Sequence, residues 1–270
     1  MRNSGQNFRR RLIRAAARLA ARLDPAGPGT EGIRILTYHR VVEIPGDRLA
    51  VPPGEFARQM DLLLESGWPV RDLGEALAVG AAALVLTFDD GYRDIYDNVF
   101  PVLRALRLPA TVFVVPEFIE GRVELPRYLG RGELSRPLSW EMLAEMGAEG
   151  ITVGSHSLTH RELTGLDRAE AGREIVRSRE VIGRKLGKQP DWFAYPRGKA
   201  DPGLARQVRA AGYRGAVTVR PGINRPPCDR YLLRRTEISG SDNREDFMLK
   251  LEGGFDLPHR IWQGIAGKRL

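Results

Sequence analysis

Short runs of consecutive apolar residues alternate along this chain with longer stretches in which apolar residues recur every three or four positions. The short runs predict strands at residues 33–39, 83–88, 110–115, 151–155, 192–195, 215–219 and 231–233. The longer stretches predict helices over 54–66, 94–107, 139–147 and 167–187. This alternation is typical of a parallel α/β fold. About seven βα units suit a barrel as readily as an open sheet, and we predict a distorted or incomplete (β/α) barrel of about seven parallel strands.

Residues that start or stop helices sharpen several of these boundaries. Asp167 is a predicted N-cap and Gly187 a predicted stop for the long helix between them. Ser139 is predicted to open another helix, with Gly147 near its end. Pro101 lies inside the 94–107 stretch, so it predicts either the start of a second helix or a kink in the first.

The first 32 residues differ from the rest of the chain. Residues 8–23 combine apolar side chains at helical spacing with many arginines, which predicts a basic amphipathic helix. Such a helix lies either in an anionic membrane surface or packed on its own domain, and the pattern leaves both open. A Pro- and Gly-rich linker follows. We therefore divide the chain into residues 1–32, a basic helix and linker, and residues 33–270, a single large domain.

Composition narrows the classes of protein that fit. With 42% hydrophobic and 28% charged residues, the chain suits one sizeable globular domain. No apolar run approaches the ~18 residues that a membrane-spanning helix needs. Seven arginines and one aspartate in the first 30 residues supply most of the formal charge of +8 and leave +2 for the remainder, which gives no support to nucleic-acid binding. Cys228 is the single cysteine, so an internal disulfide is excluded and a loop thiol is expected.

The basic helix also bears on where the protein works. Arg14, Arg18 and Arg22 interrupt its apolar stretch, so it makes a poor secretory signal. We expect a cytoplasmic protein, and we hypothesise that residues 8–23 hold it reversibly at the inner face of the membrane.

Polar residues gather where the predicted strands end. His39, the pair Asp89 and Asp90, His156 with Ser155 before it, and the segment 195–198 each lie at or just past such an end. The carboxyl ends of the strands form the active-site face of a parallel α/β barrel. Four such coincidences indicate a functional site on that face.

Two short motifs carry metal chemistry. Asp89 and Asp90 stand side by side in TFDDGY, which taken alone also suits a solvated turn. His156 and His160 are four residues apart, a spacing that would bring both imidazoles to one side of a helical turn, although a core His and a surface His would give the same letters. Together with Asp90 they make a two-His, one-carboxylate set, which leaves a coordination position free for water.

TFDDGY, SHSLTH and FAYPRG, in this order, resemble the polysaccharide deacetylase family, which includes the nodulation-type chitooligosaccharide deacetylases. The resemblance covers roughly residues 33–255. The opening LTYHRV further resembles the branch that acts on poly-N-acetylglucosamine, in which the strand order is permuted and an early His supplies the acid. The resemblance implies hydrolysis of an N-acetyl group on an amino sugar, with a divalent metal, most often zinc, or cobalt or nickel.

The resemblance also implies roles for individual residues. Asp90, His156 and His160 would hold the metal and Asp89 would be the general base. His39 would be the general acid, and we prefer it to His259 because of its position at a strand end. The backbone N–H of Arg197 would help to hold the oxyanion.

The sequence differs from the family's pattern at one position. Many members carry an Arg that pairs with the base, and Ala194 stands there in this chain. Arg235, Arg40 or Arg197 would have to take its place. Three aromatic residues that could stack on sugar rings, Trp140, Trp192 and Tyr195, are more typical of a barrel core.

Three other functions fit parts of the pattern. An enzyme of the same fold could act on a non-sugar amide, because the two histidines do not determine which molecule carries the acetyl group. A metal-free glycosidase would need its two carboxylates about 5–9.5 Å apart, and adjacent Asp89 and Asp90 suit that poorly. A non-catalytic, membrane-associated glycan binder fits residues 8–23 but leaves the acid, base and metal set without a use.

Overall fold

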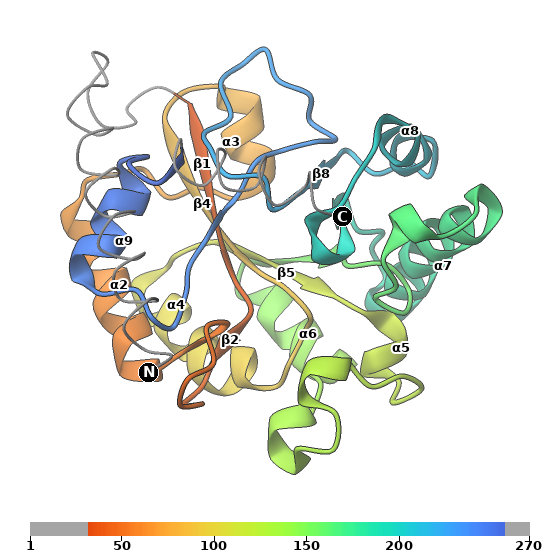
Figure 1. Ribbon diagram of the computed structural model, residues 1–270, viewed down its shortest axis with the longest axis horizontal. Helices are drawn as coiled ribbons and strands as arrows, with labels where there is room; N and C mark the ends of the chain where they lie inside the picture. Colours follow the sequence, from red (N-terminus) through yellow and green to blue (C-terminus); the bar gives the residue numbers. More distant parts are fainter. Residues whose placement is uncertain (1–31, 257–270) are drawn as a thin grey trace, which may run out of the picture.

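The computed structural model describes residues 32–256, and its centre is a curled sheet of seven parallel strands in the order β8-β7-β6-β5-β4-β1-β9. The strands are β1 (Ile33–Tyr38), β4 (Ala83–Phe88), β5 (Ala110–Val114), β6 (Ile151–Ser155), β7 (Trp192–Ala194), β8 (Gly215–Val217) and β9 (Thr236–Glu237). A separate two-stranded sheet pairs β2 (Arg40–Val41) with β3 (Ala50–Val51). The expected distorted (β/α) barrel is confirmed (Figure 1).

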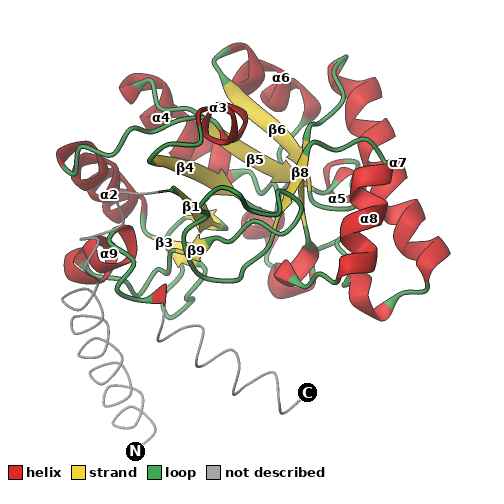
Figure 2. Ribbon diagram, turned by 90° about the horizontal axis from the view of Figure 1, so that it is seen from above, coloured by secondary structure: helices red, strands yellow, loops and turns green. Residues whose placement is uncertain are grey.

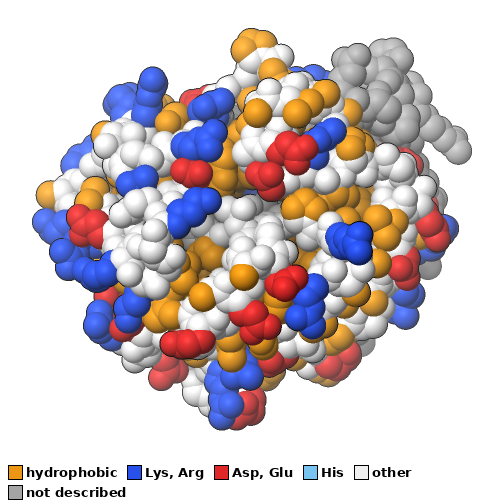
Figure 3. Space-filling model, turned by 180° about the vertical axis from the view of Figure 1, so that it is seen from behind, with side chains coloured by type: hydrophobic (Ala, Val, Ile, Leu, Met, Phe, Trp, Pro, Cys, Tyr) orange, Lys and Arg blue, Asp and Glu red, His pale blue; other side chains and the backbone are white. Residues whose placement is uncertain are grey.

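Helices surround this sheet, as the view from above shows (Figure 2). They are α2 (Pro53–Glu65), α3 (Leu73–Val79), α4 (Phe100–Leu106), α5 (Pro116–Ile119), α6 (Trp140–Ala148), α7 (Arg168–Leu186), α8 (Pro202–Ala210) and α9 (Arg244–Leu251). Every residue of β1, β4 and β5 is buried, as expected for strands covered by helices on one side and filled by side chains on the other. Over the face seen in Figure 3, acidic and basic side chains are interspersed with apolar and uncharged ones.

The helix boundaries follow the capping chemistry that the sequence predicts. Asp167 accepts a hydrogen bond from the amide of Glu170 at the start of α7, and Gly187 ends the helix in the left-handed conformation. Ser139 accepts from the amide of Met142 and opens α6. The stretch with Pro101 changes type, because a π-helical turn (Ile95–Val99) precedes α4, which begins at Phe100.

The predicted strand at 231–233 is wrong. Leu233 makes one parallel bridge, to Val217 of β8, and the seventh strand is β9, which pairs with β1. The amide of Leu233 donates to the carbonyl of Ala216 (3.0 Å), and the amide of Ile238 donates to that of Thr37 (2.9 Å). The segment 233–238 therefore starts against one edge of the sheet and ends against the other. It crosses the gap between β8 and β1, with Thr236 opposite Leu36 within β1.

Of the three aromatic residues named above, Trp192 and Tyr195 belong to the core and Trp140 is partly buried against it. Trp192 and Tyr195 are 4% and 0% exposed, and the Tyr195 hydroxyl donates to the carbonyl of Tyr231. Trp140 packs against the main core, and its indole N–H donates to Glu120 at 2.6 Å. Cys228 is exposed, as a loop thiol should be.

Some expectations lie outside the described residues. The basic segment 8–23 and His259 are among them, so the structure does not test the membrane helix or the alternative acid. Within residues 32–256, no helix is both long and apolar enough to span a bilayer.

Candidate metal centre

The parallel register brings the expected strand-end residues together. Tyr38 at the end of β1 lies opposite Phe88 at the end of β4, and the amide of Asp89 donates to the Tyr38 carbonyl at 2.9 Å. His39 and Asp89 are therefore neighbours across the sheet. Two strands further on, His156 follows β6, and its amide donates to the carbonyl of Val114 at the end of β5 (2.8 Å).

Asp90, His156 and His160 converge. Their ligand atoms all lie within 4.8 Å of one another. Oδ1 of Asp90 is 3.6 Å from Nε2 of His156 and 3.4 Å from Nε2 of His160. That oxygen is buried, and no hydrogen bond from the described residues satisfies it. A buried carboxylate oxygen without a donor is costly, and a cation held between it and the two imidazoles would satisfy it.

The tautomer of His156 suits metal binding. Its Nδ1 lies 2.8 Å from the carbonyl oxygen of Ala194, which can only accept, so Nδ1 carries the proton and donates. Nε2 is then left with a lone pair directed toward Asp90. Burial lowers the pKa of His156 to about 4, although Asp89 opposes this shift, so the imidazole is neutral at neutral pH. This is the orientation and charge state that a metal-ligating histidine needs.

A loop brings the two histidines together, so the helical turn that their spacing predicts is wrong. Residues 156–162 have no helical assignment, and both Ser157 and His160 have positive φ, 63° each. Ser157 Oγ accepts from the amide of His160 at 3.0 Å. Glu174 of α7 accepts from the amides of Leu158 and Thr159, both at 2.9 Å. Since side-chain oxygens take these amide protons, the backbone has no need of helical bonds.

Backbone strain is concentrated on this face. Five described non-glycine residues have positive φ, and four of them, Asp90, Ser157, His160 and Arg197, are on the loops of the site. The fifth, Arg107, ends a helix. Left-handed conformations cost non-glycine residues roughly 1–3 kcal/mol and cluster where function requires them.

Asp89 has a different partner from its neighbour. Arg235 donates to both of its carboxylate oxygens, at 2.7 and 2.6 Å, with both residues 1% exposed or less. Arg235 also donates to the carbonyl of Thr218 (2.8 Å) and to Thr87 Oγ1 (3.2 Å). Burial by itself would raise the pKa of Asp89, but the guanidinium of Arg235, with smaller contributions from His156 and His39, holds it well below its usual range.

Arg235 is thus the arginine that takes the place of the one missing at Ala194. The other two candidates are used elsewhere. Nε of Arg40 is 2.7 Å from Asp94, and its guanidinium lies over the ring of Tyr92. The Arg197 side chain is 3.6 Å from Glu162 at the surface. Ala194 itself supplies the carbonyl that orients His156.

The expected acid and oxyanion donor also lie at strand ends. His39 is half-buried after β1, and its Nδ1 makes no hydrogen bond to the described residues. It is close enough to Asp89 for its charge to lower the pKa of that carboxyl. Arg197 lies in the turn Pro196–Gly198 after β7, with φ of 57°. In this turn the amide of Gly198 donates to the Tyr195 carbonyl at 2.7 Å.

Sequence reasoning missed Glu174 as a part of the site. It is 6% exposed, and its two oxygens take three hydrogen bonds from the loop between the histidines, including one from Thr159 Oγ1 at 2.6 Å. Its position within the apolar periodicity of α7, beside Ile175, is the one sequence signal, because a carboxylate on a core-facing stripe requires a partner.

Comparisons with known proteins identify relatives of this sequence and of this fold. The sequence profile for polysaccharide deacetylase matches residues 78–216, about half of the chain. The chain is similar to Bacillus subtilis YxkH, whose name places it among the polysaccharide deacetylases, with 28% identity over 212 residues, 76% of this chain and 71% of that protein. It is 23% identical over 231 residues to the poly-beta-1,6-N-acetyl-D-glucosamine N-deacetylase of Escherichia coli, which is 71% of this chain but only 34% of that longer enzyme. Among solved structures, IcaB from Ammonifex degensii superposes with a TM-score of 0.69 at 27% identity, covering 83% of this chain and 97% of that one.

Proposed function

This chain belongs to the polysaccharide deacetylase family, and we propose that it is a metal-dependent hydrolase that removes N-acetyl groups from an amino sugar in a saccharide or glycolipid precursor. The observation that carries the proposal is the convergence of Asp90, His156 and His160 next to a second carboxylate, Asp89, that is kept ionised. Two imidazoles and one carboxylate form an open three-ligand set.

The donor set fits a divalent ion. Asp90 Oδ1 and the Nε2 atoms of His156 and His160 would hold it, and nitrogen with oxygen ligands suits zinc, with cobalt or nickel as substitutes. When bound, such an ion polarises the acetyl carbonyl and lowers the pKa of an attacking water toward about 7.

Asp89 serves in the proposed reaction as the general base. It is ionised at neutral pH because Arg235 stabilises the charged form, and Arg235 fixes the orientation of its carboxylate through two hydrogen bonds. Oδ2 of Asp89 is 3.9 Å from His156 Nε2, so the carboxylate lies next to the ligand atoms without joining them. It accepts the proton of the water that attacks the acetyl carbon.

His39 and Arg197 complete the proposed reaction. His39, across from Asp89, gives its proton to the sugar nitrogen as the carbon–nitrogen bond breaks, which yields acetate and a free amine. The backbone N–H of Arg197 donates to the carbonyl oxygen as negative charge develops on it, and one such donor is worth about 3–4 kcal/mol in comparable sites.

The test is product analysis on defined substrates. Oligosaccharides of N-acetylglucosamine with β-1,4 or β-1,6 linkages are incubated with the protein, and acetate and the mass of the sugar are measured. We expect loss of acetyl groups, abolished in Asp89→Asn and reduced about 10²–10⁴-fold in His39→Gln. Asp97→Asn is the control, because Asp97 is an exposed carboxylate paired with Arg93.

Each alternative gives a different outcome. Faster hydrolysis of simple N-acetylated amines than of any saccharide would indicate the non-sugar amidase. Saccharide binding with no release of acetate under any metal would indicate the glycan-binding protein. Cleaved glycosidic bonds would indicate the glycosidase, which the geometry disfavours because Arg235 clamps Asp89 while Asp90 faces the histidines.

We also propose that the protein works at the cytoplasmic face of a membrane, held there by residues 8–23. The support is the sequence pattern of arginines and apolar residues at helical spacing. Full-length protein should partition onto vesicles that contain anionic lipid, and protein lacking residues 1–30 should not. Equal partitioning of the two forms would contradict this.

A further inference from the structure

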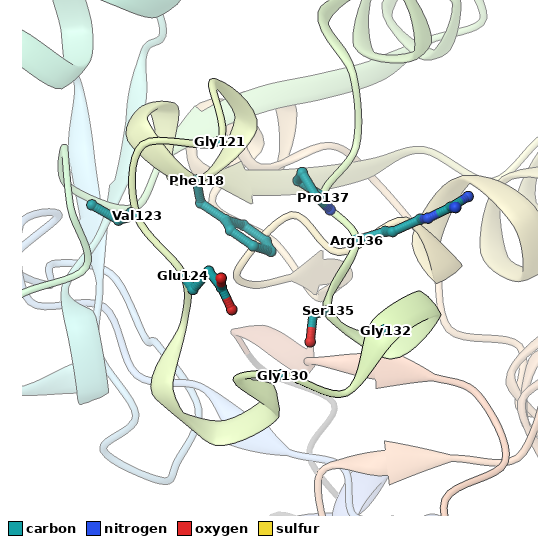
Figure 4. Close-up of a pocket in the computed structure, with 9 residues that line it drawn as sticks. All are labelled: Phe118, Gly121, Val123, Glu124, Gly130, Gly132, Ser135, Arg136 and Pro137. Atoms are coloured by element: carbon teal, nitrogen blue, oxygen red, sulfur yellow. The ribbon is translucent and has the colours of Figure 1, made fainter.

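A pocket of about 420 Å³ opens between α5 and the start of α6. It is lined by Phe118, Gly121, Val123, Glu124, Gly130, Gly132, Ser135, Arg136 and Pro137 (Figure 4). Nothing in the proposed reaction uses these residues.

The residues next to the walls of this pocket are hydrogen-bonded to both loops that carry the proposed metal ligands. The amide of Leu138 donates to the carbonyl of Gly91, next to Asp90, at 2.9 Å. The amide of Glu117, next to Phe118 and its ring, donates to the carbonyl of Leu158 in the histidine loop at 3.1 Å. The Phe118 ring also meets that of Tyr92 edge-on, with centroids 5.0 Å apart. The pocket therefore lies beside the two loops that carry the proposed metal ligands.

One free charge faces this space. Figure 4 shows the carboxylate of Glu124 and the ring of Phe118 directed into the pocket, whereas the guanidinium of Arg136 points away from it. Arg136 is paired with Glu133 at 2.6 Å. Among the described residues, Glu124 has no hydrogen bond or ion pair.

The glutamates near Glu124 differ from it because they are ion-paired. Glu117 and Glu120 both lie within ion-pair distance of Arg122, at 3.0 and 3.7 Å, and Glu120 also binds Lys185 at 2.7 Å. Among the described residues around the pocket, Glu124 is thus an exposed carboxylate without a protein partner, and a ligand in the pocket can reach it.

We propose that the pocket binds a sugar unit with a free amine, on the same oligosaccharide as the unit being deacetylated. Pro137, which is partly exposed, suits the apolar face of a pyranose ring, and the Glu124 carboxylate suits an ammonium group. Because the proposed reaction produces such amines, the enzyme would favour chains that it has already begun to deacetylate. This inference rests on the proposed function.

The first experiment compares rates on two N-acetylglucosamine oligomers, one fully acetylated and one with a free amine on a flanking unit. We expect wild type to prefer the second by about two- to fivefold in kcat/KM, the size of an exposed ion pair, and to lose the preference in high salt. Glu124→Gln keeps the shape of the side chain and should bring the ratio to about one. Glu180→Gln, at an exposed carboxylate of α7 that does not line the pocket, should keep the wild-type ratio.

The second experiment needs no catalysis and separates this inference from the proposed function. Binding of a fully deacetylated glucosamine oligomer is measured by calorimetry for the same three proteins. Binding weakened about two- to fivefold by Glu124→Gln alone supports the pocket even if no acetate is released. Acetate release with equal ratios and equal binding in wild type and Glu124→Gln overturns the pocket and leaves the deacetylase intact.

Discussion

Replacing Arg235 with Met should destabilise the fold and raise the pKa of Asp89, the proposed general base. Met has a similar length and no charge, so it leaves the Asp89 carboxylate buried without a partner. In the wild-type structure both residues are almost completely buried and joined by two hydrogen bonds of 2.6–2.7 Å. Removing one partner of such a pair costs about 3–5 kcal/mol, because the other charge stays in a medium of low dielectric constant.

The sign of the pH effect follows from the pKa of Asp89. In wild type, Arg235 depresses this pKa, so the ionised carboxylate contributes stability above the ordinary carboxyl pKa, and that stability is lost as the pH falls toward the folded value. Without the guanidinium, burial remains and raises the pKa. The acid limb of kcat/KM should therefore move to higher pH in Arg235→Met, and the gap in stability between the two proteins should be largest at neutral pH.

Urea unfolding and the pH dependence of acetate release measure the two effects. Arg34→Met is the matched control, because Arg34 is 1% exposed and binds Asp256 through two hydrogen bonds at the opposite end of β1. It should destabilise the protein without moving the acid limb. An Arg235→Met protein with unchanged stability and an unchanged pH profile would refute the role assigned to the pair.

Three further predictions follow from the same geometry. Glu174→Gln should weaken divalent-metal binding about 10–100-fold by calorimetry, because it loosens the histidine loop, whereas Glu180→Gln on the exposed side of α7 should not. Gly198→Ala should cost more than 2 kcal/mol in urea unfolding, since its φ is +65° and a Cβ would lie 2.4 Å from a backbone nitrogen, while Gly67→Ala, at φ +72° in open space, should cost about 1 kcal/mol. The metal-free protein should lose stability as the pH falls from about 6.5 toward about 4, because His156 binds a proton in this range in the unfolded chain but stays neutral when buried in the folded one. A free energy of unfolding that does not depend on pH in this range would contradict this. So would a His156→Gln protein with the same pH dependence as wild type.

Much of the sheet and the three candidate ligands could be predicted because their signals are local. The strands at 83–88 and 110–115 are continuous apolar runs, and a parallel sheet puts their carboxyl ends on one face. Asp90 and His156 stand within two residues of such runs, so their meeting follows from the topology, and the spacing of His160 from His156 adds the third residue.

The features that were missed or left open depend on contacts between distant parts of the chain. Arg235, one of three candidates for the partner of Asp89, is 146 residues from it and reaches the carboxylate only because the segment 233–238 crosses between the two edges of the sheet. β9 is two residues long, too short for any pattern to reveal. The histidine loop looked helical because its spacing is helical, and the deciding group, Glu174, lies on another element.

Metal titration of acetate release tests the central claim most directly. Protein purified without a metal-affinity tag is stripped by a chelator, and the initial rate on an N-acetylglucosamine oligosaccharide is followed as zinc is added. The proposed centre predicts no activity in the stripped protein and a linear rise that levels off at about one equivalent per chain, as a single three-ligand site requires. Full activity in the stripped protein, or no dependence on any divalent metal, would contradict the account.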